Sequence, residues 1–213
     1  FTPEFARQSA EEFVRDVVAG RLRARGIVLG HDSRFGRGRE GDLELLARLG
    51  RELGIEVRRC DPELHQGRPL SSSLIREAIA AGRLQEAALL LGRPPVVIGT
   101  VVRGDRRGTL LGFPTANIPL GRSVRPPAGV YAVEVPLEGR ICRGVANLGR
   151  RPTFESGGTE ILEVHLLDYP GGDLYGRTLE VRFLRRLREE RRFENVEALR
   201  RQIQADIESV RGR

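Results

Sequence analysis

Apolar positions recur with two different periods along the chain, and the change between them divides it near residue 92. In the first part, segments with apolar residues at helical spacing alternate with short apolar runs bounded by glycine. Such runs are typical of buried parallel strands, and their alternation with helices predicts an α/β fold. The expected helices cover residues 10–18, 42–53, 74–81 and a stretch ending at residue 91, and the expected strands cover 26–30 and 55–57.

After residues 92–95 the pattern changes to β-rich segments punctuated by glycine and proline, which predicts an all-β part, an antiparallel barrel or sandwich. An amphipathic helix is expected over 196–210, with Leu199, Ile203 and Ile207 on one stripe. We therefore predict two domains, 1–92 and 93–213. The expected strands of the second domain are 96–102, 129–136, 139–146, 160–167 and 178–184.

The composition is that of a globular protein, with 39% apolar and 31% charged residues. No apolar run approaches the roughly 18 residues that would span a bilayer. Cys60 and Cys142 lie far apart without partners at metal-ligand spacing, so we expect two reduced thiols in a cytoplasmic protein. The chain has no methionine and opens at Phe1, which indicates that a segment precedes it.

All 36 basic residues are arginine, so a Walker-type phosphate loop, which needs lysine, is excluded within this sequence. The net charge of +7 is uneven: residues 1–92 hold 15 Arg against 14 acidic residues, and 93–213 hold 21 against 15. A basic second part suits a polyphosphate ligand and also nucleic acid. The densest basic run, 182–192, is interleaved with glutamate and apolar residues, which favours a solvated face over a docking surface.

A glycine-rich segment over 103–117 is the first candidate for chemistry. Gly104, Gly108 and Gly112 would let backbone N–H groups approach phosphate oxygens. Thr115 and Asn117 are two residues apart, so in an extended segment both side-chain oxygens face the same side, and such oxygens suit Mg²⁺. A simple hairpin with turn-forming Thr and Asn would have the same spacing, and spacing alone does not separate the two.

Glu163 is the second candidate. In the strand expected over 160–167, alternation places it on one face with Ile161, His165 and Leu167. A carboxylate on a partly apolar face is either a surface residue at a strand edge or a base whose pKa is raised by partial burial. We interpret His165 as a hydrogen-bonded structural residue.

Four segments of the second part resemble segments of riboflavin kinases in residue identity and in order along the chain. They are Gly-Phe-Pro-Thr-Ala-Asn at 112–117, Gly-Val-Tyr at 129–131, Val-Ala-Asn-Leu-Gly-Arg-Arg-Pro-Thr-Phe at 145–154, and Glu-Val-His-Leu-Leu-Asp at 163–168. The resemblance extends over essentially all of 93–213. It implies a Greek-key-type antiparallel β-barrel with a C-terminal helix, and the phosphorylation of riboflavin to FMN by ATP.

The resemblance also implies a role for each candidate. The glycine loop would hold the ATP phosphates, Thr115 and Asn117 would bind Mg²⁺ and the nucleotide, and Glu163 would take the proton from the terminal ribityl hydroxyl of riboflavin. A loop around 147–154 is a candidate lid over the flavin, and its candidate residues are Asn147, Arg150, Arg151 and Phe154.

The first 92 residues resemble the later part of the Rossmann-like nucleotidyltransferase domain in bacterial bifunctional riboflavin kinase/FMN adenylyltransferases (FAD synthetases), which convert FMN to FAD. The resemblance lies in Gly-His-Asp-Ser-Arg-Phe-Gly at 30–36 and Ser-Ser-Ser-Leu-Ile-Arg at 71–76. The first ATP motif of that family, which leads into His-x-Gly-His, is absent from these 213 residues and is expected before Phe1. We therefore expect FMN formation without FAD formation from this chain. The candidate residues are Asp32, Arg34, Phe35, Ser71, Ser72 and Arg76.

One alternative of a different class remains, a basic β-barrel that binds RNA or a protein partner without catalysis. Aromatic residues make up only 5% of the chain, and no strand pair alternates arginine with aromatics in the way that stacks bases, so we expect no nucleic-acid partner. We also expect no membrane partner, and the sequence leaves the oligomeric state open. Quenching of riboflavin fluorescence on binding would distinguish the kinase from this alternative.

Overall fold

The computed structural model describes residues 1–105, 107–121, 124–150 and 160–212, with the side chains of Arg107 and Arg150 left out. These residues form two compact units, Phe1–Leu70 and Ser71–Arg213. No helix within the described ranges has the length and apolarity to cross a membrane. Cys60 is exposed and Cys142 half-buried, and both are free thiols.

The first unit is built on two parallel strands, β1 (Gly26–Gly30) and β2 (Glu56–Cys60). Asp42 begins α3 because its carboxylate accepts the Leu45 N–H at 3.0 Å, and Gly54 ends that helix with φ 68°. The helices of this unit are α1 (Pro3–Ala6), α2 (Ala10–Glu12), a π-helix continuing from it (Phe13–Arg21), a 3₁₀ turn (Arg37–Arg39) and α3 (Leu43–Leu53). A short hairpin of β3 (Leu64–His65) and β4 (Arg68–Pro69) ends it.

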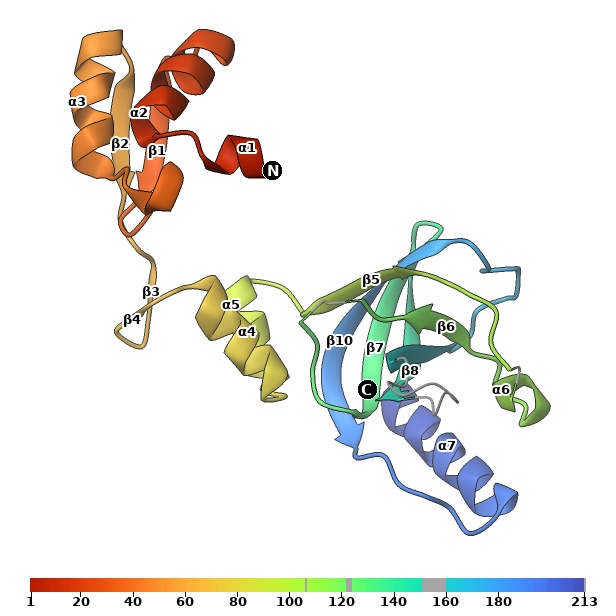
Figure 1. The fold of residues 1–213 in the computed structure, drawn as a ribbon. Helices are drawn as coiled ribbons and strands as arrows, with labels where there is room; N and C mark the ends of the chain where they lie inside the picture. Colours follow the sequence, from red (N-terminus) through yellow and green to blue (C-terminus); the bar gives the residue numbers. More distant parts are fainter. Residues whose placement is uncertain (106, 122–123, 151–159, 213) are drawn as a thin grey trace. The chain divides into compact units, whose positions relative to one another are not determined.

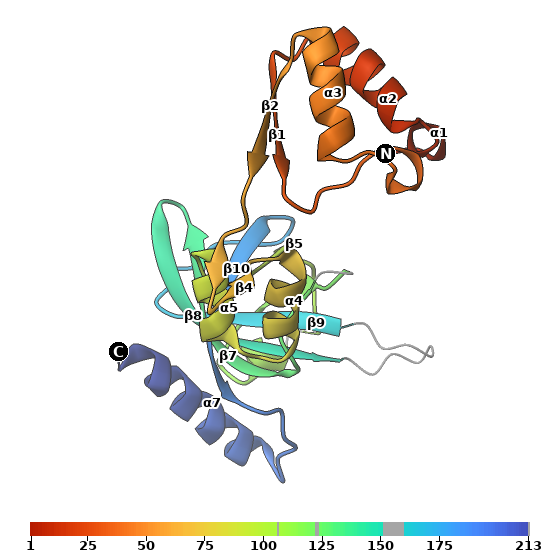
Figure 2. The same cartoon turned by 90° about the vertical axis from the view of Figure 1, so that its left-hand side faces the viewer.

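The π-helix and α3 lie on one face of β1 and β2 (Figures 1 and 2). Val14, Leu46 and Leu49 form a core there. The predicted parallel strand at 26–30 is confirmed. Ile27 and Leu29 pack against the core, whereas Val28 on the other face is 68% exposed.

The second unit begins with two helices, α4 (Ser72–Ala80) and α5 (Leu84–Leu91), as expected from the sequence. Gly82, with φ +75°, turns the chain between them. Leu84 is only 1% exposed because it belongs to the core of the barrel that follows. The two helices therefore pack with the second unit, although their sequence pattern resembles that of the first, and the functional division at residue 92 stays a prediction.

The barrel is one six-stranded antiparallel sheet in the order β5-β10-β7-β8-β9-β6. Figure 1 labels all of these strands except β9, and Figure 2 all except β6. The Val102 N–H donates to the Asn117 carbonyl at 2.8 Å, which bridges the end of β5 to β6 and nearly closes the sheet. The strands are β5 (Val96–Thr100), β6 (Ala116–Pro119), β7 (Gly129–Leu137), β8 (Arg140–Arg150), β9 (Glu160–Leu166) and β10 (Thr178–Arg188). The prediction of an antiparallel barrel is confirmed.

The two faces of this sheet have different contents. The inner face holds the main core, in which the Tyr131 and Phe183 rings meet edge to face at 5.3 Å. Burial raises the pKa of Tyr131, whose hydroxyl donates to the Pro127 carbonyl at 2.5 Å. On the outer face, α7 (Val196–Arg211) packs Ile207 and Val210 on residues of β7 and β8. The same outer face carries the candidate site.

Candidate active site

A cavity of about 500 Å³ lies on the outer face of the barrel, between the segment before β6, the strands β7 to β10 and the helix α7. The segment before β6 contains a short helix, α6 (Arg107–Leu110). Of the residues predicted to carry chemistry, Gly108, Thr115, Asn117, Asn147 and Glu163 line this cavity. Residues far apart in the sequence are therefore brought into one cavity by strand pairing.

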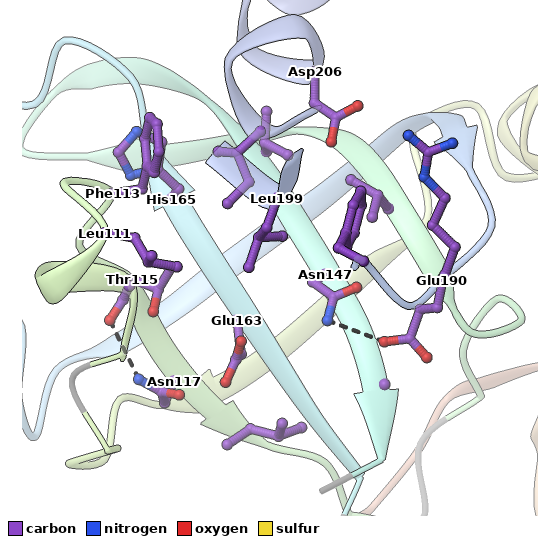
Figure 3. Close-up of a pocket in the computed structure, with 18 of the residues that line it drawn as sticks. Leu111, Phe113, Thr115, Asn117, Asn147, Glu163, His165, Glu190, Leu199 and Asp206 are labelled. Atoms are coloured by element: carbon purple, nitrogen blue, oxygen red, sulfur yellow. Dashed lines mark hydrogen bonds between the residues drawn. The ribbon is translucent and has the colours of Figure 1, made fainter. Parts of the chain in front are cut away.

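The register of three neighbouring strands places Glu163 between two asparagines. Asn117 in β6 and Asn147 in β8 are both opposite Glu163 in β9. Figure 3 shows the three side chains in a row, with Glu163 in the middle. The predicted alternation on β9 is confirmed, because Ile161, Glu163 and His165 line the cavity while the residues between them face the barrel core.

At one end of the row, Asn117 is only 5% exposed and its Nδ2 donates to the Thr115 carbonyl at 3.3 Å (Figure 3). A Cβ added at Gly104 would lie 2.6–2.8 Å from the Asn117 amide, and one at Gly108 would lie 2.4 Å from the Phe113 carbonyl oxygen. Glycine is therefore required at both positions for close packing. Gly112 turns the chain after α6 with φ +87°.

At the other end, the Asn147 Nδ2 donates to Glu190 Oε1 at 3.1 Å (Figure 3). Glu190 also packs closely on Gly149, where an added Cβ would lie 2.2 Å from its Oε1. The row then continues across β7 to Arg188 in β10, which pairs with Asp206 of α7. Sequence reasoning missed Arg188, Glu190 and Asp206.

One sequence signal could have pointed to Asp206. It lies seven residues after Leu199 and three after Ile203, and so it shares the apolar stripe of the C-terminal helix. A carboxylate on such a stripe needs a buried partner or a wet cavity. Leu199 and Ile203 themselves line the cavity.

His165 is held as a structural residue, in agreement with its interpretation from the sequence. Its Nδ1 is 2.8 Å from the Pro114 carbonyl, to which it donates, and its ring meets the Phe113 ring edge to face at 5.7 Å. These contacts fix the segment that leads into Thr115.

The oxygens of Thr115, Asn117 and Glu163 are hard donors of the kind that Mg²⁺ accepts when phosphates and water complete its shell. Within the described parts of the chain, no three His, Cys, Asp or Glu side chains are grouped as a metal site. The donor set thus fits a magnesium ion that arrives with a phosphate ligand better than one held by protein alone.

Two family models match the chain: "Riboflavin kinase" over residues 91–212 and "FAD synthetase" over residues 1–74. The bifunctional riboflavin kinase/FMN adenylyltransferase of Haemophilus influenzae is 39% identical over 99% of this chain and 68% of its own. This chain belongs to the bifunctional riboflavin kinase/FMN adenylyltransferase family.

The member of this family from Escherichia coli K12 is 44% identical over 97% of the chain, which spans 66% of that relative's length. A crystal structure titled as a macrolide-efflux protein from Streptococcus pneumoniae has a TM-score of 0.84 and 35% identity over 100% of this chain and 68% of its own. The similarity of this structure extends over both units.

The flavin lid expected from the family resemblance falls only partly on described residues. Asn147 lines the cavity, and Arg150 is the last residue of β8. Arg151 and Phe154 lie outside the described residues. The lid stays a prediction.

The residues expected to belong to the adenylyltransferase part are divided between the two units. In the first, the Arg34 Nη1 donates to Asp42 Oδ2 at 2.6 Å, and the Phe35 ring lies 6.1 Å from that of Phe13. The Leu45 N–H and then Arg34 lower the pKa of Asp42. The Oδ1 of the exposed Asp32 lies 3.8 Å from the Nδ1 of His31.

In the second unit, Ser71 caps α4 by accepting the Leu74 N–H at 3.2 Å. Ser72 begins that helix and Arg76 is exposed on it. Ser71 therefore has a structural role as the cap of this helix, and a role toward phosphate stays a prediction for all six residues.

Proposed function

We propose that the barrel cavity is a riboflavin kinase site, which transfers the γ-phosphate of ATP to the terminal hydroxyl of riboflavin. The observation that carries the proposal is the row of Asn117, Glu163 and Asn147, with Thr115 beside it, in one cavity on one face of the sheet. The family membership supports the same activity.

The phosphates of ATP would bind at the end of the cavity that holds Thr115, Asn117 and Gly108. The oxygens of Thr115 and Asn117 would hold the Mg²⁺ of Mg·ATP, which supplies positive charge to neutralise the phosphates. The close packing of Gly104 against the Asn117 amide fixes the direction of that side chain. The protein thus contributes position and orientation rather than covalent chemistry.

Glu163 would act as the general base. The terminal ribityl oxygen forms a bond to the γ-phosphorus, the bond from that phosphorus to the bridging oxygen of ADP breaks, and the Glu163 carboxylate takes the hydroxyl proton. The attacking and leaving oxygens are roughly in line across phosphorus. The acceptor therefore enters from the side of Asn147, opposite to Thr115.

That acceptor side suits a large, mostly flat molecule with a polar tail. Leu199 and Ile203 of α7 and the ring of Phe193 provide apolar surface there, while Asn147 and Glu190 provide polar groups. The ribityl chain would reach Glu163 from this side. No nucleic acid is required by any of these contacts.

Product analysis by chromatography tests the proposal with riboflavin, ATP and Mg²⁺ as the only reactants. The expected product is FMN, and titration of riboflavin with the protein should quench flavin fluorescence. No FMN and no quenching would defeat the kinase proposal and favour the non-catalytic binding module.

The same chromatographic analysis tests FMN adenylyltransfer, the second activity for which the relatives are named. The match of the FAD synthetase model to residues 1–74 supports FMN adenylyltransfer as a function of the family's first part. From these 213 residues we expect FMN without FAD, because His-x-Gly-His is not among them. FAD formed from FMN and ATP would overturn that expectation and leave the kinase proposal untouched.

A further inference from the structure

Asp206 is a buried carboxylate at the acceptor end of the cavity, and the proposed chemistry leaves it without a role. It is only 5% exposed, and Asn117 at the phosphate end is the other buried polar side chain among the described residues. The Arg188 Nε donates to its Oδ1 at 3.2 Å and its Oδ2 at 3.0 Å, and Arg188 Nη2 lies 2.9 Å from Oδ2. This two-pronged pair joins α7 to the end of β10.

Two hydrogen bonds and two cation–π contacts extend the pair into a closed ring. The Gln202 Nε2, one turn before Asp206 on α7, donates to Asp206 Oδ1 at 2.8 Å, and Arg191 Nη2 donates to Gln202 Oε1. The guanidinium carbons of Arg188 and Arg191 lie 5.7 Å and 4.9 Å from the centre of the Phe193 ring. We name these five residues the Asp206 ring: Arg188, Arg191, Phe193, Gln202 and Asp206.

The Asp206 ring holds the segment 189–195 at its start and in its middle, because Arg188 Nη1 donates to the Glu189 carbonyl at 3.1 Å and Arg191 and Phe193 are themselves members of the ring. This segment has no helix or strand of its own, yet Glu190, Arg191 and Phe193 from it line the cavity. Its conformation must therefore come from side-chain contacts. Apolar residues could tie α7 to β10 equally well, so stability alone does not explain a charge pair at this position.

We propose that Asp206 is a positioning residue for the acceptor: through Arg188 and Gln202 it fixes the segment 189–195, and so sets the fit of the flavin end of the substrate. The inference rests on the proposed kinase function. It assigns to the C-terminal helix a part in acceptor recognition that is separate from its packing on the barrel.

The test compares wild type with Asp206→Asn, which keeps the size of the side chain and removes its charge. The KM for riboflavin should rise about tenfold or more, because the half-buried Arg188 loses its charged partner and releases the segment. The KM for Mg·ATP, whose proposed site lies beyond Glu163, should change less than about twofold, since distant sites act independently. Riboflavin affinity without ATP, measured by fluorescence quenching, should fall in parallel.

A matched control removes a different ion pair from the same helix. Arg211→Gln breaks the pair of Arg211 Nη2 with Asp168 Oδ1 at 2.6 Å, which is exposed and lies outside the cavity lining. Both KM values should stay those of wild type. A rise in the riboflavin KM as large as that of Asp206→Asn would mean that any loosening of α7 has this effect, and would overturn the inference.

If Asp206→Asn does not fold, Gln202→Ala tests the same inference. Gln202 is only half-buried, and its removal detaches Arg191 from α7 while the pair of Arg188 and Asp206 remains. Riboflavin affinity should fall by several-fold, with the KM for Mg·ATP unchanged. Wild-type riboflavin affinity in Gln202→Ala would overturn the inference. Absence of FMN formation by wild type would instead defeat the kinase proposal.

Discussion

The two faces of the barrel sheet are made by alternate residues of the same strands, but they differ in the side chains that they carry and in the contacts that these make. In β9, Leu162 and Val164 are buried in the inner core, while Glu163 between them faces the cavity. The inner face is packed from apolar and aromatic side chains, with the Tyr131 hydroxyl hydrogen-bonded to a backbone carbonyl. The outer face combines apolar packing under α7 with polar side chains at defined positions.

This difference teaches that stability and chemistry can be altered separately within one sheet. A change on the inner face should lower the free energy of unfolding and leave the chemistry of the folded protein intact. A change on the outer face should impair the chemistry and leave the free energy of unfolding nearly unchanged. Four predictions test that separation, in order of decreasing effect.

The largest effect is expected from Glu163→Gln on the outer face. The substitution keeps size and hydrogen bonding but removes proton acceptance, so kcat for FMN formation should fall by roughly 10²–10⁴. Riboflavin affinity and thermal stability should change little. A suitable control is Glu180→Gln, another strand glutamate, which pairs with Arg182 at 2.7 Å and does not line the cavity. A kcat for Glu163→Gln near that of Glu180→Gln would reassign Glu163 to structure.

The inner face should respond in the opposite way to Phe183→Ala. Phe183 is 1% exposed and packs on the Tyr131 ring, so its truncation leaves a cavity and should cost about 3–5 kcal/mol in the free energy of unfolding. Urea unfolding measures this loss. The kcat per folded molecule should stay within about twofold of wild type, as far as distant sites are independent. A large fall in kcat at conditions where the variant is folded would show that the two faces are coupled.

Much of the barrel and part of the site could be predicted, because both depend on local periodicity. The alternation on β9, the cap at Ser71 and the stripe of α7 all follow from residues within one segment. The pairing of Asn147 with Glu163 could not be predicted, since periodicity gives the face of a strand and not its neighbour. The resemblance named Asn147 only as part of a lid.

Because local periodicity does not give tertiary neighbours, some features were assigned to the wrong part of the fold from the sequence, and others were missed. Leu84 was grouped with an α/β pattern, yet its side chain enters the barrel core. Arg188 and Asp206 come together only after α7 has docked, and no spacing rule connects a residue at a strand end with a helical residue eighteen positions later. Such partners are fixed by tertiary packing.

On the outer face, removal of oxygens at the phosphate end should have a smaller effect than loss of the base. Thr115→Val and Asn117→Ala each remove one donor at the proposed Mg·ATP site, so kcat/KM for Mg·ATP should fall about 10- to 100-fold. Riboflavin binding, measured by fluorescence, should be nearly unchanged. Titration of the rate with Mg²⁺ should give a weaker apparent affinity in both variants. If the Mg²⁺ dependence and the KM for Mg·ATP were those of wild type, the proposed metal residues would be wrong.

The smallest expected effect comes from adding one methyl group behind Asn117. In Gly104→Ala the new Cβ would lie 2.6–2.8 Å from the Asn117 amide, and Asn117 is buried, so one of the two must move. Overpacking of this kind typically costs about 1–3 kcal/mol, and a part of that should be seen as a rise of about three- to tenfold in the KM for Mg·ATP. Gly121→Ala is the matched control, because nothing lies within 4 Å of its added Cβ. If both alanine variants had the KM of wild type, the direction of Asn117 would not depend on Gly104, and the glycine would have to act through its backbone, as a phosphate-binding N–H.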